Sequence, residues 1–286
     1  MQFLRDVNYI LRSVWHDESN RKERVKRVLL AGSWQIWKRL IRKPIVVLLF
    51  NGKRFRAYPD CSCSSATIYT RIPNSRHLSF LRKHLDGGTL VDIGANVGMV
   101  SLLLADCVQN AWLFEPNPIA VARIHENLDL NRLNFEVHQC ALSDRTGSVE
   151  FETLGGVSPC NRTLDGVKTL SPTVTVPCTT FDQFFSEHGP PAVPISAIKI
   201  DVEGHENAVL RGMERFLSAQ RPRLIMFEYL QRTNLLETFE ILSRVGYRIV
   251  ELTREGPRCA DAQVAPLQDL FACPEELLAR LVPQAT

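Results

Sequence analysis

The chain has 286 residues with a formal net charge of +3, and 45% of its residues are apolar and 23% charged. These values are ordinary for a globular protein with one large domain, or one domain with an elaborated end. The small net charge excludes a strong overall field toward nucleic acid or membranes.

Targeting signals and cysteine spacing point to the cytoplasm. Charged residues such as Arg5 interrupt the first apolar positions, so no signal peptide is predicted. The longest apolar run, residues 45–50, is too short to cross a bilayer. The eight cysteines show no disulfide-framework spacing, and no second pair or histidine cluster completes a zinc site around Cys61 and Cys63. We therefore expect reduced thiols.

Residues 1–43 predict two amphipathic helices that end before Pro44. Apolar residues recur at helical spacing over Phe3–Val14 and Val25–Ile41, with basic residues opposite them. Such a helix either packs on its own domain with its charges in water, or binds a membrane surface or another anionic partner.

A β-hairpin and a short helix are predicted next. Strands at 45–50 and 54–58 flank Asn51-Gly52, a pair that favours a type I′ turn. Residues 74–86 predict a helix. We divide the chain into an N-terminal helical and hairpin extension, 1–73, and a main domain, 74–286.

From residue 89 onward, predicted strands and helices alternate. The strands are 89–93, 111–115, 135–140, 195–200, 224–227, 247–252 and 270–273, and the helices are 97–107, 118–130, 205–217, 233–245 and 275–281. A polar insertion, about 145–194, carries short strands at 148–151 and 174–177. This alternation predicts an α/β fold with a mostly parallel sheet covered by helices on both faces.

A glycine turn joins the first of these strands to its helix. Asp92 precedes Gly94, and Asn96 and Gly98 follow it, so backbone N–H groups meet a ligand at a helix N-terminus. Glu115 ends the next strand, twenty-one residues after Gly94. A carboxylate there accepts both hydroxyls of a ribose, so the two motifs predict a nucleoside cofactor.

The turn favours S-adenosylmethionine over a dinucleotide. The dinucleotide fingerprint G-x-G-x-x-G has a middle glycine for the approach of the pyrophosphate, and this chain lacks it. Asp92 would repel a pyrophosphate but bind the ammonium of an amino-acid moiety, directly or through water. An NAD(P)-dependent oxidoreductase is the alternative enzyme class, and a glycine turn used only for packing is the alternative without a ligand.

Carboxylates gather at the C-terminal ends of the predicted strands, where parallel sheets bind ligands. The set comprises Asp92, Glu115, Asp201 and Glu228. Glu203, His205 and Glu206 follow Asp201 closely, at the start of a helix. Helix N-termini favour carboxylates, but four ionisable side chains exceed what capping needs. We predict a catalytic or substrate-binding role for at least one of them.

These motifs together resemble the FkbM-type family of S-adenosylmethionine-dependent methyltransferases. The resemblance runs from about residue 88 to 274 and rests on Val91–Gly98, Phe114–Pro118, Asn127, Ala141–Asp144 with Gly147, Ile198–Glu206, Leu210–Gly212 and Phe227–Glu228. It implies the seven-stranded class I methyltransferase sheet, and O-methylation of a hydroxyl, often of a sugar or a polyketide. Residues 1–70 lie outside the resemblance, and we expect these residues to determine substrate specificity.

The resemblance assigns roles by position. Gly94 and Gly98 would form the cofactor turn, Asp92 and Asn96 would flank the methionine end, and Glu115 would hold the ribose. Backbone groups of Ala141 and Leu142 would meet the adenine edge, with Ser143 or Asp144 nearby. Asp201 and Glu203 would face the transferred methyl group, and His205 ranks below them because the family varies at its position.

A general base must take the proton of the acceptor hydroxyl. Asp201 is the first choice, Glu203 the second and His205 the third. Alternatively, Asp201 and Glu228 hold a divalent metal that lowers the pKa of the hydroxyl, while purely structural roles for Asp201 and Glu228 stay open. The other histidines show no ligand spacing to one another along the sequence and are treated as ordinary.

Two other functions compete. A nucleic-acid methyltransferase suits the basic helices, but amino-methylating enzymes of that kind usually carry an Asn/Asp-Pro-Pro-aromatic motif where this chain has Asp201-Val-Glu-Gly204. A binding module without catalysis would not need the carboxylates after residue 200. We expect a small-molecule or glycan hydroxyl acceptor, no nucleic acid, and contact with a membrane or carrier through the basic helices.

Overall fold

The structure is a computed structural model, and it describes residues 10–152, 163–164, 173–230, 233–264, 266 and 269–282. Predictions that fall on residues 1–9 and on most of 153–172 lie outside these ranges. No helix in the described residues is long and apolar enough to span a bilayer.

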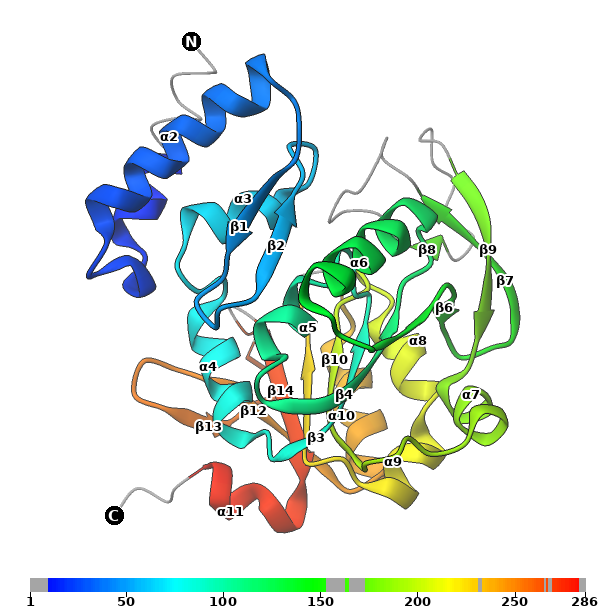
Figure 1. Ribbon diagram of the computed structural model, residues 1–286. Coiled ribbons are helices and arrows are strands. Elements are labelled where there is room, and N and C mark those ends of the chain that lie inside the picture. Colours follow the sequence, from blue (N-terminus) through cyan, green and yellow to red (C-terminus); the bar gives the residue numbers. More distant parts are fainter. Residues whose placement is uncertain are drawn as a thin grey trace.

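Eight strands form the main sheet in the spatial order β13-β12-β14-β11-β10-β3-β4-β5 (Figure 1). Their bounds are β3 Gly87–Ile93, β4 Val108–Phe114, β5 Glu136–His138, β10 Ile195–Ile200, β11 Leu224–Phe227, β12 Tyr247–Leu252, β13 Pro257–Cys259 and β14 Leu270–Pro274. The strands from β11 to β5 are parallel, and β14, β12 and β13 run antiparallel to their neighbours. The prediction of a mostly parallel α/β sheet is confirmed, and β13 adds an eighth strand at one edge.

Helices cover both faces of this sheet. They are α4 Ser75–His84, α5 Met99–Leu104, α6 Pro118–Asn131, α7 Phe181–His188, α8 Glu206–Arg211, α9 Glu214–Gln220, α10 Leu235–Arg244 and α11 Leu278–Leu281, with the 3-10 helix η2 Glu275–Leu277 before α11. Successive strand residues point to opposite faces. Leu90 of β3 therefore packs with Leu81 of α4 and Ile124 of α6, whereas Val91 packs with Val209 of α8 and the helices beside it.

The helix predicted at 205–217 is interrupted. It forms α8 and α9, which are separated at Gly212 and Met213. A Cβ atom on Gly212 would lie 2.0 Å from the carbonyl oxygen of Ser143. The chain therefore bends where two backbones approach more closely than a side chain permits.

The insertion after β5 forms a second sheet. Its strands are β6 Ala141–Leu142, β7 Gly147–Glu152, β8 Thr163–Leu164 and β9 Thr173–Thr179, in the order β6-β9-β7-β8. The short strands predicted at 148–151 and 174–177 lie within β7 and β9, which pair in antiparallel fashion. Ala141 and Leu142 pair with β9 and so bring this sheet to the edge of the main one.

The N-terminal extension packs onto the main domain through a hairpin. Its elements are a helical stretch at 10–16, the 3-10 helix η1 Glu18–Asn20, α2 Arg24–Leu40, β1 Ile45–Leu48, β2 Arg54–Ala57 and α3 Ser62–Tyr69. Phe55 and Ala57 are fully buried in the same cluster as the core of the sheet. Asn127 of α6 accepts a hydrogen bond from the backbone N–H of Arg56 at 2.8 Å. The boundary at residue 73 stays a prediction.

The hairpin turn differs from the predicted type I′. That type needs positive φ at both central residues, but of Asn51 and Gly52 only Gly52 has it, at φ 79. Gly52 donates a backbone hydrogen bond to the carbonyl of Leu49, and Leu49 donates one to Lys53. The loop therefore has three residues, and its last residue is a left-handed glycine.

Candidate active site

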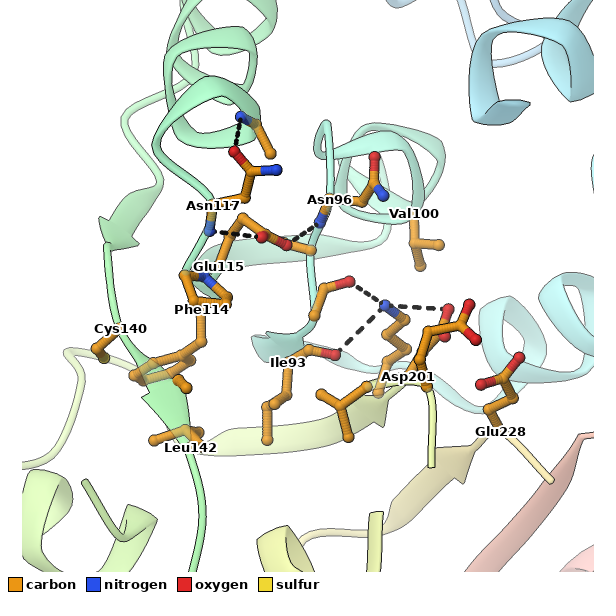
Figure 2. Close-up of a pocket in the computed structure, with 18 of the residues that line it drawn as sticks. Ile93, Asn96, Val100, Phe114, Glu115, Asn117, Cys140, Leu142, Asp201 and Glu228 are labelled. Carbon is orange, nitrogen blue, oxygen red and sulfur yellow. Dashed lines mark hydrogen bonds and ion pairs between the residues drawn. The ribbon is translucent and has the colours of Figure 1, made fainter. Parts of the chain in front are cut away.

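A cavity of about 210 Å³ lies beyond the C-terminal ends of β3, β4, β10 and β11 (Figure 2). Of the predicted site residues, those that line it are Gly94, Asn96, Glu115, Ala141, Leu142, Asp201 and Glu203, whereas Asp92, Gly98, Ser143 and His205 do not. Residues from distant parts of the chain thus meet at one edge of the sheet, as expected for parallel strands.

The glycine turn takes the shape that the motif predicts. Gly94 has φ 74, and a Cβ atom there would lie 1.9 Å from the carbonyl oxygen of Asp201. Asn96 also adopts a left-handed conformation, at φ 52. Gly98 precedes α5 at φ 75 and lies behind the cavity lining. Only glycine therefore fits at residue 94, because it combines positive φ with close contact between neighbouring strand ends.

Glu115 fixes the turn against the end of β4. Its two carboxylate oxygens accept hydrogen bonds from the backbone N–H groups of Asn96 and Asn117, at 2.8 and 2.9 Å. Burial raises the pKa of Glu115 to about 7, although these two N–H groups oppose the shift. A carboxylate oxygen accepts more than one hydrogen bond, so Glu115 retains acceptor capacity for hydroxyl groups in the cavity.

Lys199 is a cavity residue that the sequence analysis did not single out. Its ammonium donates to the carbonyl of Gly94 at 2.7 Å and forms ion pairs with Asp92 at 3.2 Å and Asp201 at 3.4 Å. Burial alone would lower the pKa of Lys199, but these two carboxylates outweigh it and raise the pKa above its usual value. The lysine therefore joins the glycine turn to the end of β10.

Asp92 has a different environment from the one predicted. It is fully buried in β3, where its carboxylate accepts a hydrogen bond from Ser101 at 2.6 Å and pairs with Lys199. It does not line the cavity. Its charge reaches a ligand only through Lys199 and the turn, so the structure does not bring Asp92 into direct contact with the predicted methionine ammonium.

Three carboxylates form an acidic rim, which comprises Asp201, Glu203 and Glu228. Their ligand atoms lie within 4.8 Å of one another. Burial, followed by the charges of Asp201 and Glu203, raises the pKa of Glu228 to about 8. Among the described residues that line the cavity, Lys199 is the only basic one, and its charge is already shared by two carboxylates. The rim is therefore suited to a cation.

The opposite wall of the cavity is apolar. Phe114, Ala141 and Leu142 lie there, together with Ile93 and Phe151. These side chains provide a surface on which a flat ring can pack.

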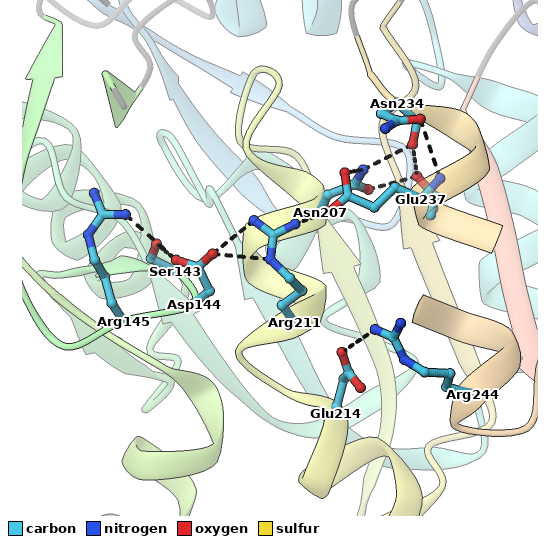
Figure 3. Close-up of polar contacts among 10 residues, drawn as sticks. Ser143, Asp144, Arg145, Asn207, Arg211, Glu214, Asn234, Glu237 and Arg244 are labelled. Carbon is cyan, nitrogen blue, oxygen red and sulfur yellow. Dashed lines mark hydrogen bonds and ion pairs between the residues drawn. The ribbon is translucent and has the colours of Figure 1, made fainter. Parts of the chain in front are cut away.

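Ser143 and Asp144, predicted near the adenine edge, turn away from this wall. Ser143 is fully buried and hydrogen-bonds His205 at 2.9 Å. Asp144 accepts two hydrogen bonds from Arg211, whose guanidinium also pairs with Glu237 (Figure 3). This network ties β6 to α8 and α10, and it places His205 in the protein interior, outside the cavity lining.

Cys63 lines the cavity from α3, an element that was not predicted. Cys61, just before α3, approaches the side-chain oxygen of Asn96 at 4.0 Å. A hydrogen bond with Cys63 lowers the pKa of Cys61 to about 6. The tight spacing of the two cysteines was visible in the sequence, but their contact with the glycine turn depends on the fold of the extension.

The fold also brings together histidines that show no ligand spacing along the chain. Glu136, His138 and His188 have ligand atoms within 4.8 Å of one another. His188 hydrogen-bonds Glu136 at 3.0 Å, and His138 stacks on Phe114 at 4.9 Å between ring centroids. This cluster supports the back of the apolar wall, because β5 and the last turn of α7 meet there.

The sequence model of the methyltransferase FkbM domain matches residues 92–249, more than half of the chain. This match spans the glycine turn, the acidic rim and six strands of the main sheet, from β4 to β12 with the end of β3. The chain therefore belongs to the FkbM methyltransferase family, and the resemblance seen in its motifs is confirmed.

Three known proteins are among those similar to this chain. The hexuronic acid methyltransferase AglP of Haloferax volcanii is 30% identical over 132 residues, which are 46% of this chain and 52% of that protein. The crystal structure of methyltransferase FkbM from Methylobacillus flagellatus KT matches with a TM-score of 0.46 at 18% identity, over 87% of this chain and 60% of that one. M. jannaschii TYW2, solved in complex with AdoMet, matches with a TM-score of 0.41 at 11% identity, over 81% of this chain and 85% of that one. The matches to the first two thus span about half and three fifths of those proteins.

Proposed function

We propose that this chain is an S-adenosylmethionine-dependent O-methyltransferase. Its proposed acceptor is a hydroxyl group of a sugar, a glycan or a polyketide-type metabolite. The observation that carries the proposal is the polarity of the cavity, where acidic side chains outnumber the one lysine and that lysine is already paired with Asp92 and Asp201. Such a cavity favours a donor that carries a sulfonium and an ammonium and has no phosphate.

The lining residues fit this cofactor. Glu115 would accept the ribose hydroxyls, and the apolar wall at Ala141 and Leu142 would pack against adenine. Asn96 and the turn at Gly94 would flank the methionine moiety. The acidic rim would face its positive charges. A dinucleotide, in contrast, would place a pyrophosphate beside carboxylates, which argues against an NAD(P)-dependent oxidoreductase.

Asp201 and Glu203 are the proposed proton acceptors. The bound cofactor would supply an electrophilic methyl group, and the rim would hold the acceptor hydroxyl in line with it. A carboxylate that takes the hydroxyl proton as the oxygen–carbon bond forms contributes about 10²–10⁴-fold to the rate. Lys199 forms an ion pair with Asp201, whose side chain is 46% exposed and lines the cavity. His205, the third candidate, contacts Ser143 instead, so we assign the proton transfer to the carboxylates.

A sugar acceptor has support from one relative. AglP is named a hexuronic acid methyltransferase, and its match covers 46% of this chain. A uronic acid is itself an anion, and the acidic rim would repel a carboxylate placed close to it. We therefore propose a sugar hydroxyl whose ring carries no charge next to the reacting oxygen.

A divalent metal at the rim is the alternative mechanism. Asp201, Glu203 and Glu228 offer oxygen ligands within 4.8 Å of one another, and hard cations prefer such ligands. The metal would lower the pKa of the acceptor hydroxyl. Activity that survives chelation with EDTA, and is not raised by added Mg²⁺, would reject this alternative and leave the carboxylates as bases.

Calorimetry and turnover test the proposal together. We expect heat on titration with S-adenosylmethionine or its demethylated product, and no binding of NADH, RNA or DNA. Asp201→Asn and Glu203→Gln should each still bind the cofactor, with an affinity reduced far less than turnover, and should lose methyl transfer to sugar acceptors. Absence of cofactor binding by the folded protein would overturn the proposed function, and normal turnover in both variants would overturn the proton-transfer roles.

A further inference from the structure

Exposed apolar side chains concentrate in the N-terminal extension. Thirteen large hydrophobic residues are exposed in the described parts of the chain, and nine of them lie between residues 15 and 48. Isolated exposed hydrophobic residues are normal on a protein surface, but a contiguous group marks a binding surface.

Four of these residues form a stripe along α2. Val25, Leu29, Ile36 and Leu40 are between 61% and 78% exposed. Their spacings of four, seven and four residues place them on one face of a helix, at about 100° per residue. We call this set the α2 stripe.

The opposite face of α2 is the one that packs on the protein. Ala31 and Trp34 are buried there, and the indole N–H of Trp34 donates to Ser65 of α3 at 3.0 Å. Figure 1 shows α2 at the periphery of the molecule, with α3 between it and the main domain. The prediction that the apolar stripe of this helix packs on its own domain is therefore wrong for Val25, Leu29, Ile36 and Leu40, because the packed face is the one that carries Ala31 and Trp34.

Basic residues surround the α2 stripe. Residues 21–43 contain nine lysines and arginines and one acidic residue, Glu23, while the whole chain has a net charge of only +3. The remainder of the chain is therefore net negative. Lys22, Arg39 and Lys43 are exposed near the two ends of the stripe. Net positive charge is thus concentrated in residues 21–43, the segment that carries the α2 stripe.

We propose that α2 is a docking surface for an anionic lipid bilayer. An amphipathic helix with a packed face, an apolar outer face and flanking lysines and arginines lies in the membrane interface, where its apolar side chains enter the acyl boundary and its cations meet lipid headgroups. Trp37 and the exposed Leu30 and Leu48 line a groove next to α2 and extend the apolar surface.

The positive charge around the α2 stripe favours an anionic bilayer as its partner over a second copy of this chain. A symmetric dimer through the α2 stripe would bring two strongly basic helices together, and like charges at an interface oppose association. The proposal goes beyond the proposed function and does not depend on it, although a membrane position would bring the cavity to lipid-linked acceptors.

Co-sedimentation of the full chain with vesicles tests the proposal. We expect binding to phosphatidylcholine vesicles that contain phosphatidylserine, about tenfold weaker binding to phosphatidylcholine alone, and weaker binding at high salt. Leu29→Gln with Ile36→Gln should lower the partition coefficient about tenfold or more. Lys22→Glu with Lys43→Glu should remove the preference for phosphatidylserine.

Matched variants control for fold and for general hydrophobicity. Leu236→Gln with Val264→Gln alters residues that are 59% and 53% exposed but lie outside the extension, and should bind vesicles like the wild type. Unchanged melting and unchanged calorimetry with S-adenosylmethionine would show that the stripe variant is folded.

Failure of the wild type to bind anionic vesicles, or equal binding by the stripe variant, would overturn the proposal. So would self-association of the wild type in sedimentation velocity that the stripe variant abolishes without any vesicle binding.

Discussion

A single buried lysine organises the polar side of the cavity. Lys199 lies in β10 between Asp92 and Asp201, with 4% of its side chain exposed. A lysine in an otherwise apolar strand gives no sequence signal for this role, because its partners are 107 residues before it and two after it along the chain. The glycine turn and the rim could be predicted, but the lysine that links them could not.

Removal of the Lys199 charge should destabilise the fold. Lys199→Met leaves Asp92 fully buried without its cation, and loss of one partner of a buried pair costs about 3–5 kcal/mol. Urea denaturation followed by circular dichroism measures this cost. Lys83→Met, at an exposed site, should change stability by less than about 0.5 kcal/mol. Equal effects of the two substitutions would show that the buried ion pairs do not stabilise the protein.

The pKa of Glu228 is raised to about 8, mainly by burial. This shift predicts how the free energy of unfolding depends on pH. The folded protein holds a proton at Glu228 that the unfolded chain releases near its ordinary pKa of about 4.3. This group therefore stabilises the fold at low pH and loses that contribution as the pH rises from about 4 to about 8.

Glu228→Gln should remove this part of the pH dependence. The variant should match the wild type at low pH and exceed its stability above pH 8, as measured by urea midpoints across the pH range. Glu240→Gln, at a glutamate on α10 outside the cavity, is the control and should follow the wild type. Parallel profiles for all three proteins would contradict the raised pKa.

At the scale of elements, Asn127 connects the extension to the glycine turn. Its side chain accepts from the N–H of Arg56 in β2 and donates to the carbonyl of Val97 at 3.0 Å. Asn127→Ala leaves the buried carbonyl of Val97 and the half-buried N–H of Arg56 without this partner. It should cost about 1–3 kcal/mol, with a weaker affinity for S-adenosylmethionine in calorimetry.

Asn131 provides the comparison for that substitution. It makes the same kind of contacts to Arg54, at 2.7 and 2.6 Å, but these two hydrogen bonds are exposed, so water replaces the lost partners. Asn131→Ala should therefore cost less than Asn127→Ala and leave cofactor binding unchanged. The reverse order would mean that the hairpin does not support the turn.

The elements that periodicity predicts are those buried on one or both faces. The strands at 195–200, 224–227 and 247–252 were predicted with the observed bounds. Each is a short apolar run, and the residues that flank such a run indicate where the strand begins and ends. The hairpin was expected, but its turn type was wrong, since Asn-Gly also fits the end of a three-residue loop. Helix α3 was missed because its sequence, Ser-Cys-Ser-Ser-Ala-Thr-Ile-Tyr, has neither helical periodicity nor high helix propensity.

At the scale of the whole molecule, the extension and the main domain share one hydrophobic core. Trp34, Leu49 and Phe55 belong to the same buried cluster as Leu90 and Leu113 of the sheet. Sequence alone suggested a division at residue 73, because family motifs begin only later. Packing across a boundary depends on tertiary contacts that no local pattern records.

The shared core predicts a single unfolding transition. Variants that retain only Trp34 or only Trp112 report on the extension and on the sheet, and their fluorescence should change at the same denaturant concentration. Calorimetric and van't Hoff enthalpies should also agree. Two separate midpoints would show instead that the extension folds as an independent unit.

The polar residues of the cavity differ in how well the fold should tolerate their substitution. Asn96, Asp201, Glu203 and Glu228 all come after the last residue of a strand. Their replacement should leave the packing of the sheet and its helices undisturbed. Libraries of variants at these loop positions should therefore yield enzymes that methylate other acceptors. Lys199 alone is embedded inside a strand, and it is the position where such libraries should tolerate the least diversity.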